Sequence, residues 1–264
     1  MIKLAILGIF AFLVSLIVTA PAHLADEYLP PDIHASNLQG TVWQGQASQL
    51  RFRGFDFGQV SWELRPHALL LGRIQADVSV ERVDLRAHGN IARGLSAYHV
   101  FDAHLEGGEQ LLAPIASNYG VTLDGPIEAD IDELAFNDVG PQAADGLIVW
   151  RDARLVQPAS LSLGDVNVSL AQEDIVATAQ LSNTGEALNL NGNAQLRAGW
   201  TYDVHLQIAP TPATSQQVRD TLPIIGEPDA RGAVTINRQG TLAAVSADAP
   251  RAPPASRSTR QTNN

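Results

Sequence analysis

Apolar and polar residues alternate along most of this chain. The clearest runs are 74–80, 83–87 and 127–131, in which Ile, Val, Leu or Ala takes every second position and polar residues take the others. Alternation with a period of two is typical of strands that bury one face and expose the other to water. Gly-rich breaks recur between the runs. The pattern predicts a mostly antiparallel β body that begins at about residue 38.

Two segments interrupt the alternation and predict two short helices. They are 108–118 and 215–225. Each is followed closely by a glycine, Gly120 or Gly226, that suits a left-handed helix end. The predicted fold class of the body is therefore all-β apart from these two helices.

The N-terminus has a different pattern. An apolar run extends from Leu4 to Ala20, and no charged residue occurs between Lys3 and Asp26. As a helix, the uncharged stretch would be about 33 Å long, enough to cross a hydrocarbon layer of about 30 Å. With Lys3 on the cytoplasmic side, the pattern predicts a single-pass protein of the cell inner membrane, with its body in the periplasm of a Gram-negative bacterium. The alternative is a signal peptide cleaved near the Ala-Pro-Ala at 20–22, which would also export the body.

A recurring offset of 106 or 107 residues relates the two halves of the body. The flanking sequences agree as well, since LQGTVWQGQA matches ADGLIVWRDA. This self-similarity predicts a tandem duplication. The residue pairs at the offset are Gly40 and Gly146, Trp43 and Trp150, Ala47 and Ala153, Gly58 and Gly164, and Gly125 and Gly232.

The chain is accordingly divided into six segments. They are a cytoplasmic tip and transmembrane anchor (1–25), a spacer (26–37), β repeat 1 (38–134), a linker (135–143), β repeat 2 (144–240) and a disordered tail (247–264). Because the linker is short, we expect the two repeats to pack their apolar faces together. The alternative is that each apolar face curls on itself and leaves an open groove.

Six residues at equivalent positions of the repeats are predicted to have structural roles. Each Trp follows a Gly turn at the start of a strand, where a large ring is typical of the core. The alternative is that these rings bind a partner or an acyl chain. The six residues are Gly40, Trp43, Ala47, Gly146, Trp150 and Ala153.

The composition excludes several classes of protein. The chain has 28 acidic and 17 basic residues, a net charge of -11 and no Cys. A nucleic-acid-binding protein needs a basic face, so this imbalance argues against one. An acidic body is also poorly suited to electrostatic docking on anionic lipids. Without Cys there is no disulfide, thiol nucleophile or Cys-ligated zinc.

No catalytic motif is evident in the sequence. GxGxxG, P-loop, GxSxG and HExxH patterns are all absent. In a regular strand Asp102 and His104 would share one face and His99 the other, so the three could converge on a metal only at a bulge. We interpret them as solvated strand positions.

The acidic residues of 127–132 also have a simple interpretation. Glu128, Asp130 and Asp132 are expected on one strand face, but at a spacing of about 7 Å one strand cannot enclose a calcium ion. We therefore predict a protein that is not an enzyme and has no cofactor and no metal site.

Several short motifs occur in an order that resembles a known family. They follow the N-terminal apolar run and are Gly-Thr-Val-Trp-Gln-Gly-Gln-Ala (40–47), Leu-Gly-Arg (71–73), the Val-Trp and Ala within 146–153, Leu-Pro-Ile-Ile-Gly (222–226) and Gly-Ala-Val-Thr-Ile (232–236). Over about residues 1–240 the chain resembles protein N of the bacterial type II secretion system (general secretion pathway). Asp152 departs from the repeat, since Gly45 stands at that place in the first copy.

The resemblance implies a non-enzymatic accessory component of the inner membrane, with a periplasmic β domain, that helps to export folded proteins through the outer-membrane secretin. It implies partners among other type II secretion components, in the inner-membrane platform or the secretin complex, and no catalytic residues. We expect contacts through exposed strand edges, such as the strand around 74–80. The alternative function is an anchored periplasmic lipid-handling protein whose curved sheet forms a groove.

Overall fold

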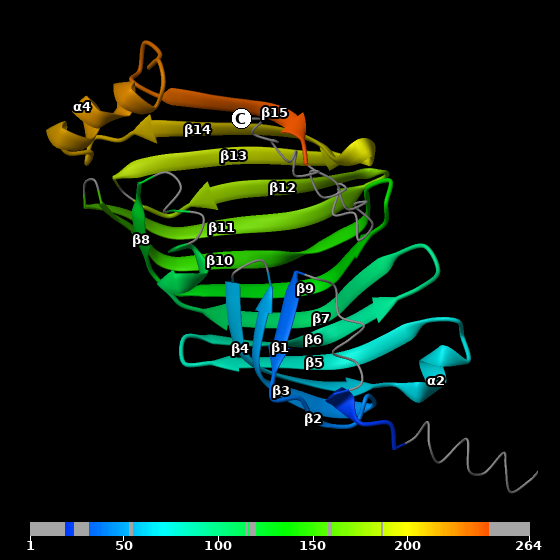
Figure 1. Cartoon of the computed structure of the whole chain (residues 1–264). Helices are drawn as coiled ribbons and strands as arrows, with labels where there is room; N and C mark the ends of the chain where they lie inside the picture. The colour runs from blue at the N-terminus through cyan, green and yellow to red at the C-terminus, as the bar shows by residue number, and fades with distance from the viewer. Residues whose placement is uncertain are drawn as a thin grey trace, which may run out of the picture.

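The sheet dominates the structure. The computed structural model describes residues 19–23, 32–52, 55–113, 116, 120–157, 160–185 and 187–242. Over these residues the chain forms one antiparallel sheet of 15 strands (Figure 1). Its order is β1-β3-β4-β5-β6-β7-β9-β10-β11-β12-β13-β14-β15, with β2 paired to β3 and β8 to β10. The predicted mostly antiparallel β body is confirmed.

The strands and helices fall into two runs along the chain. The first run is β1 (Ile33–Ser36), β2 (Gln39–Gly40), β3 (Gln44–Phe52), β4 (Phe55–Leu64), α2 (Pro66–Leu69), β5 (Ile74–Arg82), β6 (Leu85–Arg93), β7 (Tyr98–Gly107), η2 (Glu109–Leu111), β8 (Thr122–Asp124) and β9 (Ile127–Phe136). The second run is β10 (Pro141–Gln157), β11 (Leu161–Glu173), β12 (Val176–Asn183), β13 (Leu188–Arg197), η3 (Ala198–Trp200), β14 (Thr201–Pro210), α4 (Gln216–Ile225) and β15 (Val234–Thr241).

The two runs join edge to edge and not face to face. The last strand of the first half, β9, pairs with the first strand of the second half, β10, from Trp150 opposite Ile127 to Pro141 opposite Phe136. In Figure 1 the colours accordingly pass from blue at one edge of the sheet to orange at the other. The expected packing of two apolar faces against each other is therefore wrong for the described residues, because strand pairing at the junction continues a single sheet.

The turns collect at two ends of this sheet, since every strand runs antiparallel to its neighbours. We call these ends the α2 end and the α4 end, after the helix that each carries (Figure 1). The α2 end also holds the connections 94–97, 137–140, 174–175 and 198–200. The α4 end holds the β5–β6 turn at 83–84.

Residues 19–23 belong to the fold at the α2 end. Ala22 is 1% exposed, the carbonyl of Ala20 accepts a hydrogen bond from Val42 N (2.9 Å), and Pro21 forms a bridge with Thr41. Part of the predicted spacer is likewise in the sheet, because β1 pairs with β3. The predicted anchor from Leu4 to residue 18 and the tail 247–264 lie outside the described residues. Among the helices of the described part, none is long and apolar enough to span a membrane.

The two predicted short helices have different outcomes. α4 begins after Ser215, whose hydroxyl accepts a hydrogen bond from Val218 N, and it ends at Gly226 as expected. Gly226 is extended and not left-handed; it is needed because a Cβ there would lie 2.6 Å from Val234 Cγ1. In the predicted helix at 108–118, the structure describes helical conformation for the 3₁₀ helix η2 and for residues 113 and 116. The sequence pattern did not predict α2, which starts at a proline.

The two halves use their elements in the same order. In each half, five strands pair in chain order, β3 to β7 in the first half and β10 to β14 in the second. The chain then forms a helical segment and returns as β9 or β15, which pairs with the last of those five strands, β7 or β14. Gly58 and Gly164 have φ of 75° and 68° and lie opposite register shifts in β3 and β10. Both glycines are crowded, because an added Cβ would lie within 3.0 Å of a backbone atom.

Candidate functional site

One face of the sheet is apolar from β4 to β15. Residues that pair from strand to strand along its middle row are aliphatic or glycine throughout, and most are half-buried. We call this surface the apolar face. The row consists of Val60, Val80, Ala87, Leu105, Ala129, Ile148, Val168, Leu181, Gly192, Leu206 and Ile236.

In the second half, α4 covers part of the apolar face. Val218 and Leu222 of the helix pack on Leu188 of β13 and Val234 of β15, and all four are buried. Leu161, Leu163, Ile208 and Ile236 pack against this cluster. The apolar residues of α4 thus pack on the apolar face of the sheet. Burial of such side chains is the main stabilising contribution in a core.

At the α2 end the second half closes on itself. Gly199 N donates to the carbonyl of Val139 (2.6 Å), and the indole N–H of Trp200 donates to the carbonyl of Asp138 (3.3 Å). The ring of Phe136 meets that of Trp200 edge to face at 6.3 Å between centroids. The β9–β10 turn is therefore bound to the β13–β14 connection across the intervening strands.

In the first half, the apolar face contains a hollow of about 220 Å³ that no described helix covers, which we call the open trough. It lies on β5, β6, β7 and β9, and nearly all the side chains around it are aliphatic. Ile91 is 43% exposed there. The lining residues are Val78, Val80, Ala87, His88, Gly89, Ile91, Val100, Ala103, His104, Leu105, Ala129 and Ile131.

The opposite face is polar, and its chemistry changes between the halves. Across β5, β6, β7 and β9 the row that crosses the strands is charged. β10 contributes Val149 to the row, and across β11–β15 the row carries only amides and hydroxyls. Beside it in the second half lies a hollow of about 460 Å³ lined mainly by Asn, Gln and Ser. The charged row is Glu81, Arg86, Glu106 and Glu128, and the uncharged one is Asn167, Ser182, Asn191, Gln207 and Thr235.

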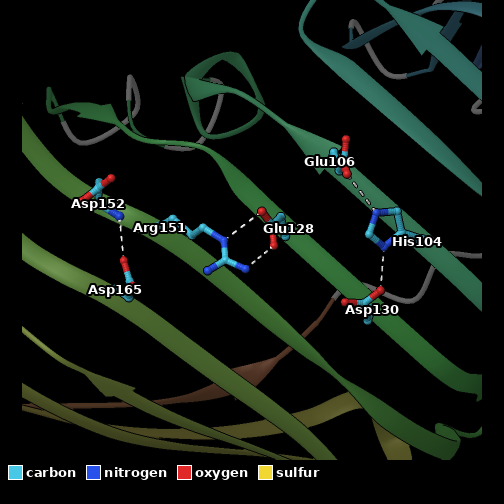
Figure 2. Close-up of polar contacts among 7 residues, drawn as sticks. All are labelled: His104, Glu106, Glu128, Asp130, Arg151, Asp152 and Asp165. Carbon is cyan, nitrogen blue, oxygen red and sulfur yellow. Dashed lines mark hydrogen bonds and ion pairs between the residues drawn. The ribbon is translucent and has the colours of Figure 1, made fainter.

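Ion pairs join neighbouring strands at the centre of the polar face, as Figure 2 shows. His104 Nδ1 lies 2.6 Å from Asp130 Oδ1, and its Nε2 lies 3.3 Å from Glu106 Oε1. Arg151 binds Glu128 through two hydrogen bonds of 2.8 and 2.6 Å. Such cross-strand pairs fix the positions of charges at the junction between the halves, although exposed pairs stabilise a fold only weakly.

These contacts shift the ionisation of their groups. The hydrogen bond to Asp130, with a second to Glu106, raises the pKa of His104. The hydrogen bonds from Arg151 lower the pKa of Glu128. The positive charge on His104 is therefore favoured in the folded protein.

A bulge changes the placement of the three residues 99, 102 and 104. Asp102 has a φ of 49°, and the β6–β7 register shifts between His88 and Asn90. His99 and His104 consequently share the polar face, contrary to the expectation for a regular strand. They face different carboxylates, since His99 Nδ1 is 3.8 Å from Glu133 Oε1. Among the described residues, no group of three or more His, Asp or Glu could hold a metal ion.

The acidic residues of β9 are interrupted by a register shift. Glu128 and Asp130 lie on the polar face and are paired with Arg151 and His104. Asp132 has no opposite residue in β10, because the register shifts between the pairs of Glu133 and Ile131. The strand is therefore not regular at the third of the three carboxylates.

The six residues predicted to be structural occupy different environments. Gly40 has a φ of 85° at the exposed end of β2, whereas Gly146 lies within β10, where a Cβ would be 2.7 Å from the carbonyl oxygen of Asp130. Ala47 and Ala153 are both 0% exposed. Trp43 and Trp150 are half-buried, and the indole N–H of Trp150 donates to the carbonyl of Asp124 (3.2 Å).

Residues that are 106 or 107 positions apart in the sequence do not all have equivalent partners in the strand pairing of the two halves. Trp150 lies opposite Val166. The residue 106 positions before Val166 is Val60, which lies opposite Ala47 and not opposite Trp43. The cause is the turn: β3 and β4 close at Phe52 opposite Phe55, whereas β10 and β11 close at Leu155 opposite Leu161. The longer second turn shifts one strand of the hairpin relative to the other.

Two features were missed by sequence reasoning. The strand around 74–80 is β5, which is paired on both sides and is not an edge; the edges of the sheet are β1 with β2 and β15. The uncharged half of the polar face was also missed, although its Asn, Ser and Gln at alternate positions of 167–195 were a visible signal.

Comparison with known proteins gives a consistent result. Residues 31–237 match the profile of the family described as type II secretion system (T2SS), protein N. A similar protein named type II secretion system protein N, from Vibrio cholerae, is 28% identical over 235 residues, 86% of this chain and 93% of the relative. One of the same name from Aeromonas hydrophila is 26% identical over 259 residues, 91% and 98% of the two chains. No solved structure matches the chain.

Proposed function

Because the chain belongs to the protein N family of the type II secretion system, we propose that it is a non-enzymatic accessory component of that machinery, working from the inner membrane on the export of folded proteins. The observation that carries this proposal is the extent of the family match, which covers residues 31–237 and with them almost the whole sheet.

Deletion of the gene tests the role in export. We expect folded substrates to accumulate in the periplasm while their passage across the inner membrane continues. Wild-type protein supplied from a plasmid should restore their release. Unchanged release from the deletion strain would contradict the proposal, and a block at the inner membrane would point to a different system.

We further propose that residues 4–20 stay attached as the anchor and place the body in the periplasm. The fold supports this, because it uses residues next to the possible cleavage site: Ala22 is buried and Ala20 binds Val42. Protease added to spheroplasts should digest the body and leave a short protected N-terminal fragment. A mature protein beginning at Pro21 or His23 would contradict the anchor.

For partner binding we propose the charged row of the polar face, which would meet a basic surface on another secretion component. Glu81→Lys reverses one exposed charge in that row, and Ser182→Lys adds the same charge at an exposed position of the uncharged row. Release of substrates should fall with Glu81→Lys and not with Ser182→Lys. Equal effects would mean that the charged row has no special role.

The shared order of elements also supports a proposal about origin, namely that the two halves arose by tandem duplication. On this view the halves kept one backbone plan, including the positive φ at Gly58 and Gly164, and diverged on their surfaces. Superposition of the halves in an experimental structure, with β4 on β11, tests this. A poor fit of β5–β7 to β12–β14 in that superposition would contradict it.

The open trough favours a second candidate function, the binding of acyl chains. A hydrocarbon needs no hydrogen bonds, and the backbone groups of the interior strands below the trough are used within the sheet. A photo-crosslinking residue at Ile91 should then capture phospholipid in cells, and one at Arg86, which lies on the opposite face of the same strand and does not line the trough, should not. Capture of lipid at neither position, or equally at both, would exclude this function.

A further inference from the structure

Exposed large apolar side chains gather at the α2 end. Leu70 is 89% exposed, Leu95 is 99% exposed and Ile175 is 70% exposed. Within the described residues the α4 end has only two of this kind, Val83 in the β5–β6 turn and Val156 near the end of β10. The exposed apolar residues of the α2 end are Leu69, Leu70, Leu71, Ile74, Leu95, Val139, Ile175 and Leu242.

These side chains belong to separate connections that lie one after another along the end of the sheet. Leu70 follows α2, Leu95 lies in the β6–β7 turn, Val139 in the β9–β10 turn and Ile175 in the β11–β12 turn. A single exposed aliphatic residue needs no explanation, but turns normally favour Gly, Asn, Asp, Pro and Ser. An aliphatic tip on each of several successive turns suits one broad apolar partner that touches them all.

Aromatic rings and an arginine lie directly behind the tips. The guanidinium of Arg93 is 4.9 Å from the ring of Tyr98, Tyr98 stacks on Phe136 at 5.4 Å, and Phe136 contacts Trp200. All four residues are at the α2 ends of their strands or in the connection at 198–200. Tyr, Trp and Arg are enriched where a protein passes from hydrocarbon to water, because each combines an apolar body with a polar group.

The chain reaches its N-terminal apolar run from this same end. The carbonyl of Ala20 binds Val42, and the carbonyl of the next residue, Trp43, accepts a hydrogen bond from Leu64 N, just before α2. This step rests on the proposed function, in which residues 4–20 are the anchor. The end that carries the apolar tips would then be the end held next to the bilayer.

We propose that the α2 end is a membrane-docking surface, which inserts its aliphatic turn tips into the periplasmic leaflet of the inner membrane. The partner is a lipid surface, because the tips are separated from one another in a row along the end of the sheet, an arrangement that suits a broad apolar layer. Insertion of apolar side chains is driven by their burial and not by attraction to anionic headgroups, so it offsets the repulsion between such lipids and the acidic body.

Single-cysteine variants test this directly, because the natural chain has no Cys. The full chain is reconstituted in nanodiscs of phosphatidylethanolamine and phosphatidylglycerol, with a fluorophore at Leu70→Cys or Leu95→Cys. Val83→Cys is the matched control, since Val83 is a fully exposed turn residue of the α4 end. Lipids with a spin label in the acyl chain should quench the first two labels several-fold more than the third.

The possible outcomes separate this inference from the anchor. Protease protection of the N-terminal segment in the same nanodiscs reports whether the anchor is inserted. A protected segment with equally weak quenching at all three positions would overturn the docking surface and leave the anchor intact. Selective quenching at Leu70 and Leu95 without a protected segment would support docking and contradict the anchor.

Discussion

The two halves of the sheet share a strand order but differ on both faces. On the apolar face, α4 covers Leu188 and Val234 in the second half, whereas the open trough of the first half has no such cover among the described residues. On the polar face the row across β5, β6, β7 and β9 is charged, whereas the row across β11–β15 carries amides and hydroxyls. Backbone plan and surface chemistry are therefore separable. The same arrangement of strands supports one half with a covered apolar face and an uncharged polar row, and another half with an open trough and a charged polar row.

The largest expected effect tests the difference on the apolar face. Leu222→Ala removes a buried side chain from the α4 cluster and should lower the free energy of unfolding by about 2–5 kcal/mol. Leu105→Ala, in the half-buried open trough, should cost less, because solvent already reaches the site. Chemical denaturation followed by Trp fluorescence measures both. Equal losses would mean that the trough is as well packed as the α4 cluster.

The next effect tests what the halves have in common. Gly58→Ala and Gly164→Ala each place a Cβ close to backbone atoms at a residue with positive φ. Each should destabilise the protein by about 1–3 kcal/mol, and by similar amounts. The same denaturation experiment is the measurement, with Gly72→Ala as the control, since Gly72 also has positive φ but has open space around it. A large loss at one glycine only would break the structural equivalence.

A smaller effect concerns pH and belongs to the first half alone. Because the pKa of His104 is raised in the folded state, its protonated form favours folding. This contribution is complete below the unfolded pKa of about 6.5 and is lost as the pH rises through the raised folded value. NMR titration of His104 gives the pKa directly. His104→Gln should remove this part of the pH dependence of stability, and an unchanged dependence would assign it to another group.

The smallest effect is expected for exposed positions of the polar face in either half. Glu81→Gln and Ser182→Ala should change the free energy of unfolding by no more than about 0.5 kcal/mol. Thermal unfolding of both variants beside the wild type measures this. A larger change at Glu81 would show that the charged row stabilises the sheet itself and does not only present charge to a partner.

Local sequence patterns predicted part of this structure. Alternation located the strands, since 74–80 and 127–131 lie in β5 and β9, and Ser215 predicted the start of α4. These features depend on residues that are close in sequence. The bulge at Asp102 and the register shift between the halves depend on pairing with other strands and on turn length, so alternation alone could not reveal them.

Sequence patterns could not predict the ion pairs, for a related reason. His104 and Asp130 are 26 residues apart, and Arg151 and Glu128 are 23 apart. Both pairs form only because β9 lies between β7 and β10 in the sheet. The strand β8, which comes between β7 and β9 in the sequence, pairs with β10 and does not separate them. The joining of the halves by strand pairing was also unpredictable, since the short linker was equally compatible with two sheets packed face to face.

The attachment of Ala20 and Ala22 to the sheet has a consequence for how the protein would search for partners. A body on a long flexible tether samples a hemisphere and spends little time in any one orientation. Here the residues after the apolar run are held by the fold itself. Under the proposed topology the body would diffuse in two dimensions at a nearly constant height, so that a partner in the same membrane meets it at a high effective concentration.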